Sequence, residues 1–196
     1  MLFRNRVVLM TGMTFALVAG TVAAQAPADI HEHRGFWIGF GLGGGVNLSE
    51  GLDGERLGGG AGYLRLGGTV SQRVLLGFDG IFWGRDENGN SIARGNSSFA
   101  MLFYPSGRGG GFLKGGLGWS NIARVTTSGN STTTTTKSGF GLTLGTGWDV
   151  RLGHNLYLTP NLDFLFQAFS SEVDPVLGEI PGTNTILLFT LGLTWH

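Results

Sequence analysis

The stretch Gly35–Asn47, GFWIGFGLGGGVN, decides how the rest of the chain is interpreted. Gly39, Gly41 and Gly44 have the spacing G-x-G-x-x-G, which is typical of a loop that holds the pyrophosphate of a dinucleotide. Such a loop needs a helix behind it, because the free N–H groups at the helix start bind the phosphate. No helical pattern follows here. Large apolar residues alternate instead with tryptophan or glycine, so we interpret the stretch as a β-strand with one apolar and one nearly bare face.

The composition indicates an exported protein with little polar surface. Residues 1–24 contain Arg4 and Arg6, an apolar run and a final V-A-A, which predicts a helical signal peptide cleaved after Ala24; an uncut membrane anchor is the alternative. Charged residues make up 13% of the 196 residues, against roughly 25% in soluble domains, and the formal net charge is zero. Without a basic excess we expect no nucleic-acid partner. Cysteine is absent, which excludes disulfides and thiol chemistry.

Alternation of apolar with small or polar residues predicts eight strands. They span residues 35–46, 60–70, 74–85, 97–105, 111–121, 139–151, 156–169 and 185–196. Most are as long as the roughly 9 to 11 residues with which a tilted strand crosses hydrocarbon. Short turns follow every second strand and long segments follow the others, and the threonine run at 132–136 is interpreted as a loop tip. All long loops would then lie at one end, as in an outer-membrane barrel with extracellular loops and short periplasmic turns.

The two faces of each predicted strand differ in bulk. Phe140 and Leu144 alternate with Thr143, and Phe164 alternates with Asp163. An eight-stranded barrel has a narrow interior that suits glycine, threonine and a few charges, so we expect the bulky side chains to face lipid. A soluble periplasmic barrel with inverted faces is the alternative. The aromatic residues near strand ends, expected at the membrane interfaces, are Phe36, Phe82, Trp119, Phe140, Trp148 and Trp195.

The predicted fold class is therefore all-β: an eight-stranded antiparallel up-and-down transmembrane β-barrel over residues 35–196, preceded by an N-terminal segment at 25–34. At GFLKGGLGWSN (111–121), GTGWDVRLGHNLYLTPNLDFLF (145–166) and TILLFTLGLTWH (185–196), the chain resembles the small outer-membrane β-barrel family of Gram-negative-type bacteria, in the style of the OmpA transmembrane domain, OmpX and OmpW. The resemblance implies a place in the bacterial outer membrane, with its lipid and lipopolysaccharide as surroundings. We expect a monomer without a cofactor.

The last strand carries a further part of the resemblance. Thr190, Gly192 and Trp195 match the C-terminal signal that the barrel-assembly machinery reads in this family, although His196 stands where a final Phe is usual. The resemblance thus implies the assembly machinery as a partner.

Charged residues on the inward face are predicted to form a self-neutralising polar network that fills the lumen. Its members are Arg65, Asp79, Lys114, Asp149, Arg151 and Asp163. If SQR at 71–73 is a three-residue turn, Arg65 and Asp79 lie directly opposite each other, where opposite charges attract. A gated ion path through the same residues is the alternative.

These features favour a structural or surface-interaction role. A barrel that transports ions or small apolar solutes is the second hypothesis, and a lipid A-modifying enzyme is the third. We expect no enzyme and assign no catalytic residue, because Ser120 in GWSN has no histidine nearby in the sequence to act as its base. His31 and His33 are an incomplete metal-ligand set, so we expect no metal and a solvated N-terminal segment.

Acidic residues are expected to dominate the long loops. They are Glu50, Asp53, Glu55, Asp86, Glu87, Glu172, Asp174 and Glu179. Such a crown would bridge to lipopolysaccharide through divalent cations or present a binding surface, and plain solubility of exposed loops is the alternative.

Overall fold

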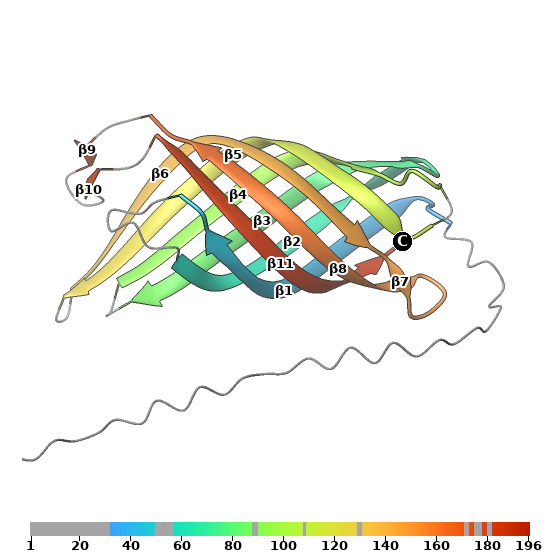
Figure 1. Ribbon diagram of the computed structural model, residues 1–196, viewed down its shortest axis with the longest axis horizontal. Helices are drawn as coiled ribbons and strands as arrows, with labels where there is room; N and C mark the ends of the chain where they lie inside the picture. The colour runs from blue at the N-terminus through green and yellow to red at the C-terminus, as the bar shows by residue number, and fades with distance from the viewer. Residues whose placement is uncertain are drawn as a thin grey trace, which may run out of the picture.

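Eight long antiparallel strands form a closed barrel (Figure 1). The computed structural model describes residues 32–49, 57–87, 90–107, 109–128, 131–170, 173–174, 178–179 and 182–196. The long strands are β1 (Phe36–Asn47), β2 (Leu57–Ser71), β3 (Val74–Glu87), β4 (Asn90–Phe103), β5 (Gly111–Ser128), β6 (Ser131–Trp148), β8 (Leu156–Ala168) and β11 (Thr183–Trp195). The short strands are β7 (Val150–Arg151), β9 (Val173–Asp174) and β10 (Gly178–Glu179). The predicted signal peptide and residues 25–31 lie outside the described residues.

Pairing between the first and last strands closes the ring. Each long strand pairs with its neighbours along the chain, β11 pairs with both β8 and β1, and Gly192 of β11 lies opposite Gly41 of β1. A closed ring satisfies the backbone N–H and C=O groups between strands, which a bilayer interior requires. No helix among the described residues has the length and apolar character to cross a bilayer. The predicted all-β, eight-stranded barrel is confirmed.

Apolar side chains cover the outer surface of the barrel. Phe40 is 55% exposed and Leu191 is 49% exposed, whereas Asp79 and Asp163 are each 1% exposed. All the aromatic residues predicted near the strand ends are exposed as well: Phe36, Phe82, Trp119, Phe140, Trp148 and Trp195. The prediction that the bulky side chains face outward is confirmed, and the inverted arrangement of a soluble barrel is wrong.

Two of the predicted long loops are instead continuations of strands. β4 begins at Asn90, close to the end of β3, and β5 and β6 continue to Ser128 and Ser131. The threonine run at 132–136 therefore belongs to β6, where it pairs with β5 from Thr127 to Ala123. The loop-tip interpretation was wrong because it took polar residues as loop, although β-branched threonine favours extended strands.

The two ends of the barrel differ in shape. The β5–β6 hairpin continues past Trp119 at one end, and β1 begins and β11 ends at the other (Figure 1). We call these the hairpin end and the turn end. The hairpin end corresponds to the predicted extracellular side, because long connections face outside and short turns face the periplasm in outer-membrane barrels.

A charge placed on the apolar belt is expected to destabilise the barrel. Leu117 of β5 is 58% exposed and lies between Phe99 and Leu142 of the neighbouring strands. Leu117→Arg is expected to lower the free energy of unfolding in lipid vesicles by about 2–4 kcal/mol, the usual cost near the bilayer midplane. Thr134→Arg, also on the outer face but in the extended part of β6, is the matched control and is expected to cost about 1 kcal/mol or less. Equal losses in urea titrations would contradict the assignment of the belt.

Candidate functional site

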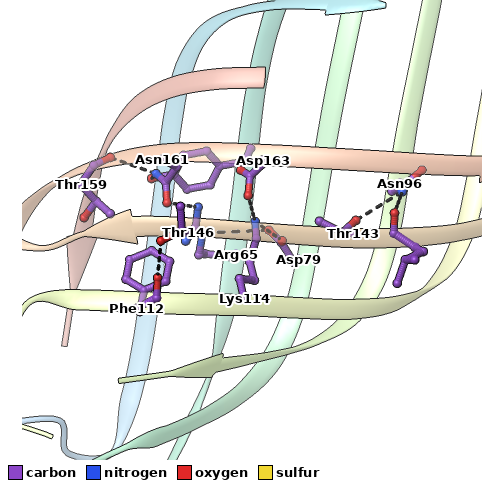
Figure 2. Close-up of polar contacts among 12 residues, drawn as sticks. Arg65, Asp79, Asn96, Phe112, Lys114, Thr143, Thr146, Thr159, Asn161 and Asp163 are labelled. Carbon is purple, nitrogen blue, oxygen red and sulfur yellow. Dashed lines mark hydrogen bonds and ion pairs between the residues drawn. The ribbon is translucent and has the colours of Figure 1, made fainter. Parts of the chain in front are cut away.

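Four charged side chains from different strands meet at the centre of the lumen (Figure 2). The Lys114 Nζ atom lies 2.6 Å from Asp79 Oδ2 and 2.8 Å from Asp163 Oδ1. The Arg65 Nε atom lies 4.0 Å from Asp79 Oδ1, and the two residues are direct partners in the β2–β3 register. We call these four residues the ion cluster. Since Lys114 reaches strands β3 and β8, neither of which is next to β5, the cluster ties three parts of the wall together.

Polar and aromatic groups surround the Arg65 guanidinium. Its Nη2 donates to Asn161 Oδ1 at 2.9 Å, and its Cζ lies 3.9 Å from the ring centroid of Tyr63. Asn161 in turn donates from Nδ2 to the Tyr63 hydroxyl at 3.1 Å. A buried guanidinium is costly unless hydrogen bonds accompany its ion pair, and the bond to Asn161 supplies one of them.

Glycines provide the space that these side chains occupy. A Cβ atom on Gly145 would lie 2.1 Å from Asp163 Oδ1, and one on Gly41 would lie 2.5 Å from the Tyr63 ring. On Gly192 it would lie 2.1 Å from the Tyr63 hydroxyl oxygen. The bare face seen in Gly35–Asn47 is thus a lumen wall against which side chains from other strands lie.

A relay of amide side chains crosses the lumen toward the hairpin end. Asn184 Nδ2 donates to Gln167 Oε1, and Gln167 Nε2 donates to Asn96 Oδ1, both at 3.0 Å. Asn96 Nδ2 then donates to the Leu142 carbonyl at 3.1 Å. The relay joins β11, β8, β4 and β6. The sequence interpretation did not predict that any of these three amides links opposite walls.

Apolar side chains fill much of the remaining lumen, which corrects the prediction of a wholly polar interior. One buried cluster lies among β2, β3, β8 and β11 and comprises Ala61, Tyr63, Ile81, Trp83, Leu165, Ile186 and Leu188. A second comprises Trp37, Leu75, Leu102, Tyr104 and Phe112. All of these residues occupy the same alternating positions in their strands as the inward polar residues. The alternation alone would therefore have placed them in the lumen. The prediction missed them because it sorted residues by polarity before assigning a face.

Asp149 lies at the turn end, separate from the ion cluster. It interrupts the strand between β6 and β7, where Tyr104 donates its hydroxyl to Oδ2 at 2.8 Å and Thr159 donates to Oδ1 at 2.6 Å. His196 Nε2 lies 3.6 Å from Oδ2. Burial acts to raise the pKa of Asp149, but its contacts with His196, Thr159 and Tyr104 outweigh burial and hold the pKa below its ordinary value. The carboxylate is therefore ionised at neutral pH and anchors the base of the lumen.

His33 is buried at this base, so the expectation of a wholly solvated N-terminal segment was wrong. Its Nδ1 lies 3.4 Å from Nδ1 of His196, and its ring centroid lies 4.1 Å from that of Tyr104. Gln72 Nε2 donates to the His33 carbonyl at 3.0 Å. The segment enters the barrel because the His33 ring fills space beside two other rings. His31 lies outside the described residues.

Arg151 is the last residue of β7, at the start of the turn to β8. Its Nε donates to the Gly153 carbonyl at 2.9 Å, and the side chain lines a pocket of about 400 Å³ that also contains His154 and Tyr157. The break in the strand at Asp149 places it there, away from the centre of the barrel where the ion cluster lies.

The residues of the predicted assembly signal divide between the two faces of β11. Thr190 is fully buried and Gly192 faces inward against Tyr63, whereas Trp195 is 56% exposed. His196 turns inward to the base of the lumen. That the assembly machinery reads these residues stays a prediction.

The hairpin end carries several basic residues, whereas the sequence interpretation expected acidic residues to dominate the long loops there. Arg85, Arg94, Arg124 and Lys137 lie on β3 to β6. Of the predicted acidic crown, Asp86 accepts a hydrogen bond from Ser91 on the outside of the barrel. The side chains of the others lie outside the described residues.

Ser120, the residue considered for an enzyme, faces the lumen. It is fully buried, and its hydroxyl donates to the Phe140 carbonyl at 2.9 Å. Among the described histidines, His33 and His196 lie at the base of the lumen and His154 lies in the β7–β8 turn. The structure therefore brings Ser120 together with none of them.

Comparison with known proteins locates the barrel among solved structures. No family model and no curated protein matches the chain. The barrel is similar to Ail, the attachment invasion locus protein of Yersinia pestis, solved in complex with the heparin analogue sucrose octasulfate: 12% identity, 83% of this chain, 98% of that chain, TM-score 0.57. It is similar also to Neisserial surface protein A: 12% identity, 84% of this chain, 99% of that chain, TM-score 0.57. Both neighbours are bacterial outer-membrane β-barrels, and at this identity the likeness concerns the fold alone.

Proposed function

We propose that this chain, which has the fold of the small bacterial outer-membrane β-barrels, is a structural and surface-interaction protein whose lumen is closed. The observation that carries the proposal is the filling of the lumen. The ion cluster, the amide relay and two apolar clusters each join walls that are not neighbours in the sheet. Eight strands leave an interior just wide enough for side chains, so a lumen filled in this way has no room for a water column.

The shape of the hairpin end supports an external role. β3 and β4 continue almost to their connecting turn, as do β5 and β6, so ordered strand pairs project beyond the apolar belt. Binding residues are commonly carried by connections on a rigid scaffold, and the crosslinked barrel is such a scaffold. The Ail structure with a bound heparin analogue supports an anionic saccharide as the kind of external ligand. Outer-membrane lipid and lipopolysaccharide would surround the belt.

A closed lumen predicts that the barrel does not conduct. The purified chain in a planar lipid bilayer is expected to give no steady conductance in 1 M KCl, because Lys114 and its two aspartates occupy the centre. Lys114→Gln, which alters the lumen, and Arg73→Gln, in the exposed turn after β2, form the matched pair of variants. Reproducible wild-type openings that change in Lys114→Gln but not in Arg73→Gln would contradict the proposal and favour a transport barrel.

A further inference from the structure

Two arginines on the inner wall at the hairpin end lie beside each other. Arg94 of β4 pairs with Ile122 of β5, and Arg124 pairs with Ile92, so the two arginines are diagonal neighbours on one face of the sheet. That face is the inner one, because Asn96 of β4, which has the parity of Arg94, is buried in the lumen, as is Ile122. Diagonal neighbours are within reach of long side chains.

The Arg94 guanidinium lacks a partner within the part of the chain that the structure describes. Its Nε and Nη1 atoms are buried and make no hydrogen bond. The nearby charge is Arg124, which has the same sign. Within the described residues, the two basic side chains at the centre of the lumen do have carboxylates: Arg65 has Asp79, and Lys114 has two aspartates. A buried guanidinium left in this state is unfavourable and would gain most from an added anion.

Two further basic residues lie near this part of the wall. Arg85 of β3 has the parity of Trp83, whose Nε1 donates to the Gly45 carbonyl on the same inner wall. Lys137 of β6 lies opposite Ile122, and its Nζ donates to the Ser170 carbonyl at 2.8 Å. Although Nε and Nη1 of Arg94 are buried, Arg94 and Arg124 are each only partly buried as residues, so part of each side chain is open to an approaching anion.

We propose that Arg94 and Arg124 form a binding site for a sulfate or phosphate ester group of an extracellular saccharide. The planar guanidinium presents two parallel N–H donors that match the oxygens of a tetrahedral oxyanion. An oxyanion between the two arginines neutralises both charges and supplies acceptors for Arg94 Nε and Nη1. The site deepens the proposed surface-interaction role and rests on it.

The test measures binding of sucrose octasulfate by calorimetry to the chain refolded in phosphatidylcholine vesicles free of lipopolysaccharide. The wild type is expected to bind, and Arg94→Gln and Arg124→Gln are each expected to weaken binding about tenfold or more. Arg73→Gln removes one positive charge from an exposed turn at the other end and is expected to stay within about twofold of the wild type. Binding by Arg94→Gln equal to that of the wild type, or no binding by the wild type, would overturn the site.

Unfolding in urea gives a second readout that does not depend on measuring affinity. Without ligand, Arg94→Gln is expected to unfold at an equal or higher urea concentration than the wild type, because it removes an unpartnered buried charge. Sucrose octasulfate at one fixed concentration is expected to raise the wild-type midpoint and to raise that of Arg94→Gln by clearly less. A ligand-free midpoint that falls in Arg94→Gln would show that the guanidinium is already paired within the chain, and would overturn the proposal.

Two further arms identify the source of the oxyanion. If phosphates of the membrane's own lipid reach the site, lipopolysaccharide in the vesicles is expected to weaken sucrose octasulfate binding. This weakening is expected to depend on Arg94. Competition by inorganic phosphate alone would identify the free anion, and competition by neither would identify a soluble saccharide. If the barrel does not conduct and Arg94→Gln binds sucrose octasulfate as well as the wild type, the proposed site is wrong and the proposed role stands. If the barrel conducts and its binding of sucrose octasulfate depends on Arg94, the proposed role is wrong and the site stands.

Discussion

Lys114→Met is expected to lower the free energy of unfolding by about 3–5 kcal/mol, which is the usual cost of removing one partner from a buried ion pair. Lys114 is the group that contacts both Asp79 and Asp163, and all three side chains are at most 2% exposed. Methionine keeps the length of the side chain and removes its charge, leaving Arg65 with two buried carboxylates. The measurement is a urea titration in lipid vesicles. Unfolding is monitored on gels of unboiled samples as the loss of the fast-migrating band of the folded barrel.

Two companion variants separate the charge from the packing. Lys114→Met combined with Asp163→Asn restores electrical neutrality, so the double variant is expected to lose less stability than Lys114→Met alone. Lys137→Met removes the same kind of side chain at the hairpin end, where the Nζ atom donates to an exposed carbonyl, and is expected to cost about 1 kcal/mol or less. If Lys114→Met and Lys137→Met had similar effects, the ion cluster would not be the crosslink described above.

Gly41→Val is expected to prevent the barrel from closing. A Cβ atom on Gly41 would lie 2.5 Å from the Tyr63 ring, 2.8 Å from Gly192 Cα and 2.8 Å from the Leu191 carbonyl oxygen. The ring of Tyr63 has room to move only at the cost of its bond to Asn161, and the other two atoms are backbone of β11, the strand that closes the ring. The variant is therefore expected to give little or no folded, fast-migrating form in unboiled gel samples.

Gly68→Val is the matched control for this prediction. Gly68 is on the neighbouring strand β2, faces outward, and a Cβ atom there would meet nothing within 4 Å. Since valine favours strands, Gly68→Val is expected to fold like the wild type. Folding of Gly41→Val to the same extent as Gly68→Val would show that the inner glycines are not required for space.

The alternation of side chains was enough to predict the outward face, because a strand turns each successive residue to the opposite side whatever its neighbours are. The Arg65–Asp79 pairing was predicted from an assumed three-residue turn at 71–73. The turn has two residues, Gln72 and Arg73, and a register shift between Thr69 and Ser71 keeps the predicted pairing. The partners of Lys114 could not be predicted in this way. They lie on strands that are not its neighbours, and the contact depends on how far the strands are staggered around the ring.

Strand ends and lumen packing were predicted less well for a different reason. Polar residues such as the threonines at 132–136 extend strands outside the membrane, where no change of hydrophobicity marks the boundary. Leu165 and Trp83 have inward parity but bulky apolar side chains, and they fit only because small residues on other strands leave space, as Gly59 does for Trp83. That relation between distant strands is not visible in any single segment.

The contact between His33 and His196 has a consequence for how such a chain gets into place. Both ends of the strand series lie on the same side of the ring, since an even number of strands brings the path back to where it began. Neither end has to travel through hydrocarbon; the connections at the hairpin end do so, and the continuation of β5 to Ser128 and of β6 from Ser131 keeps one of these connections short.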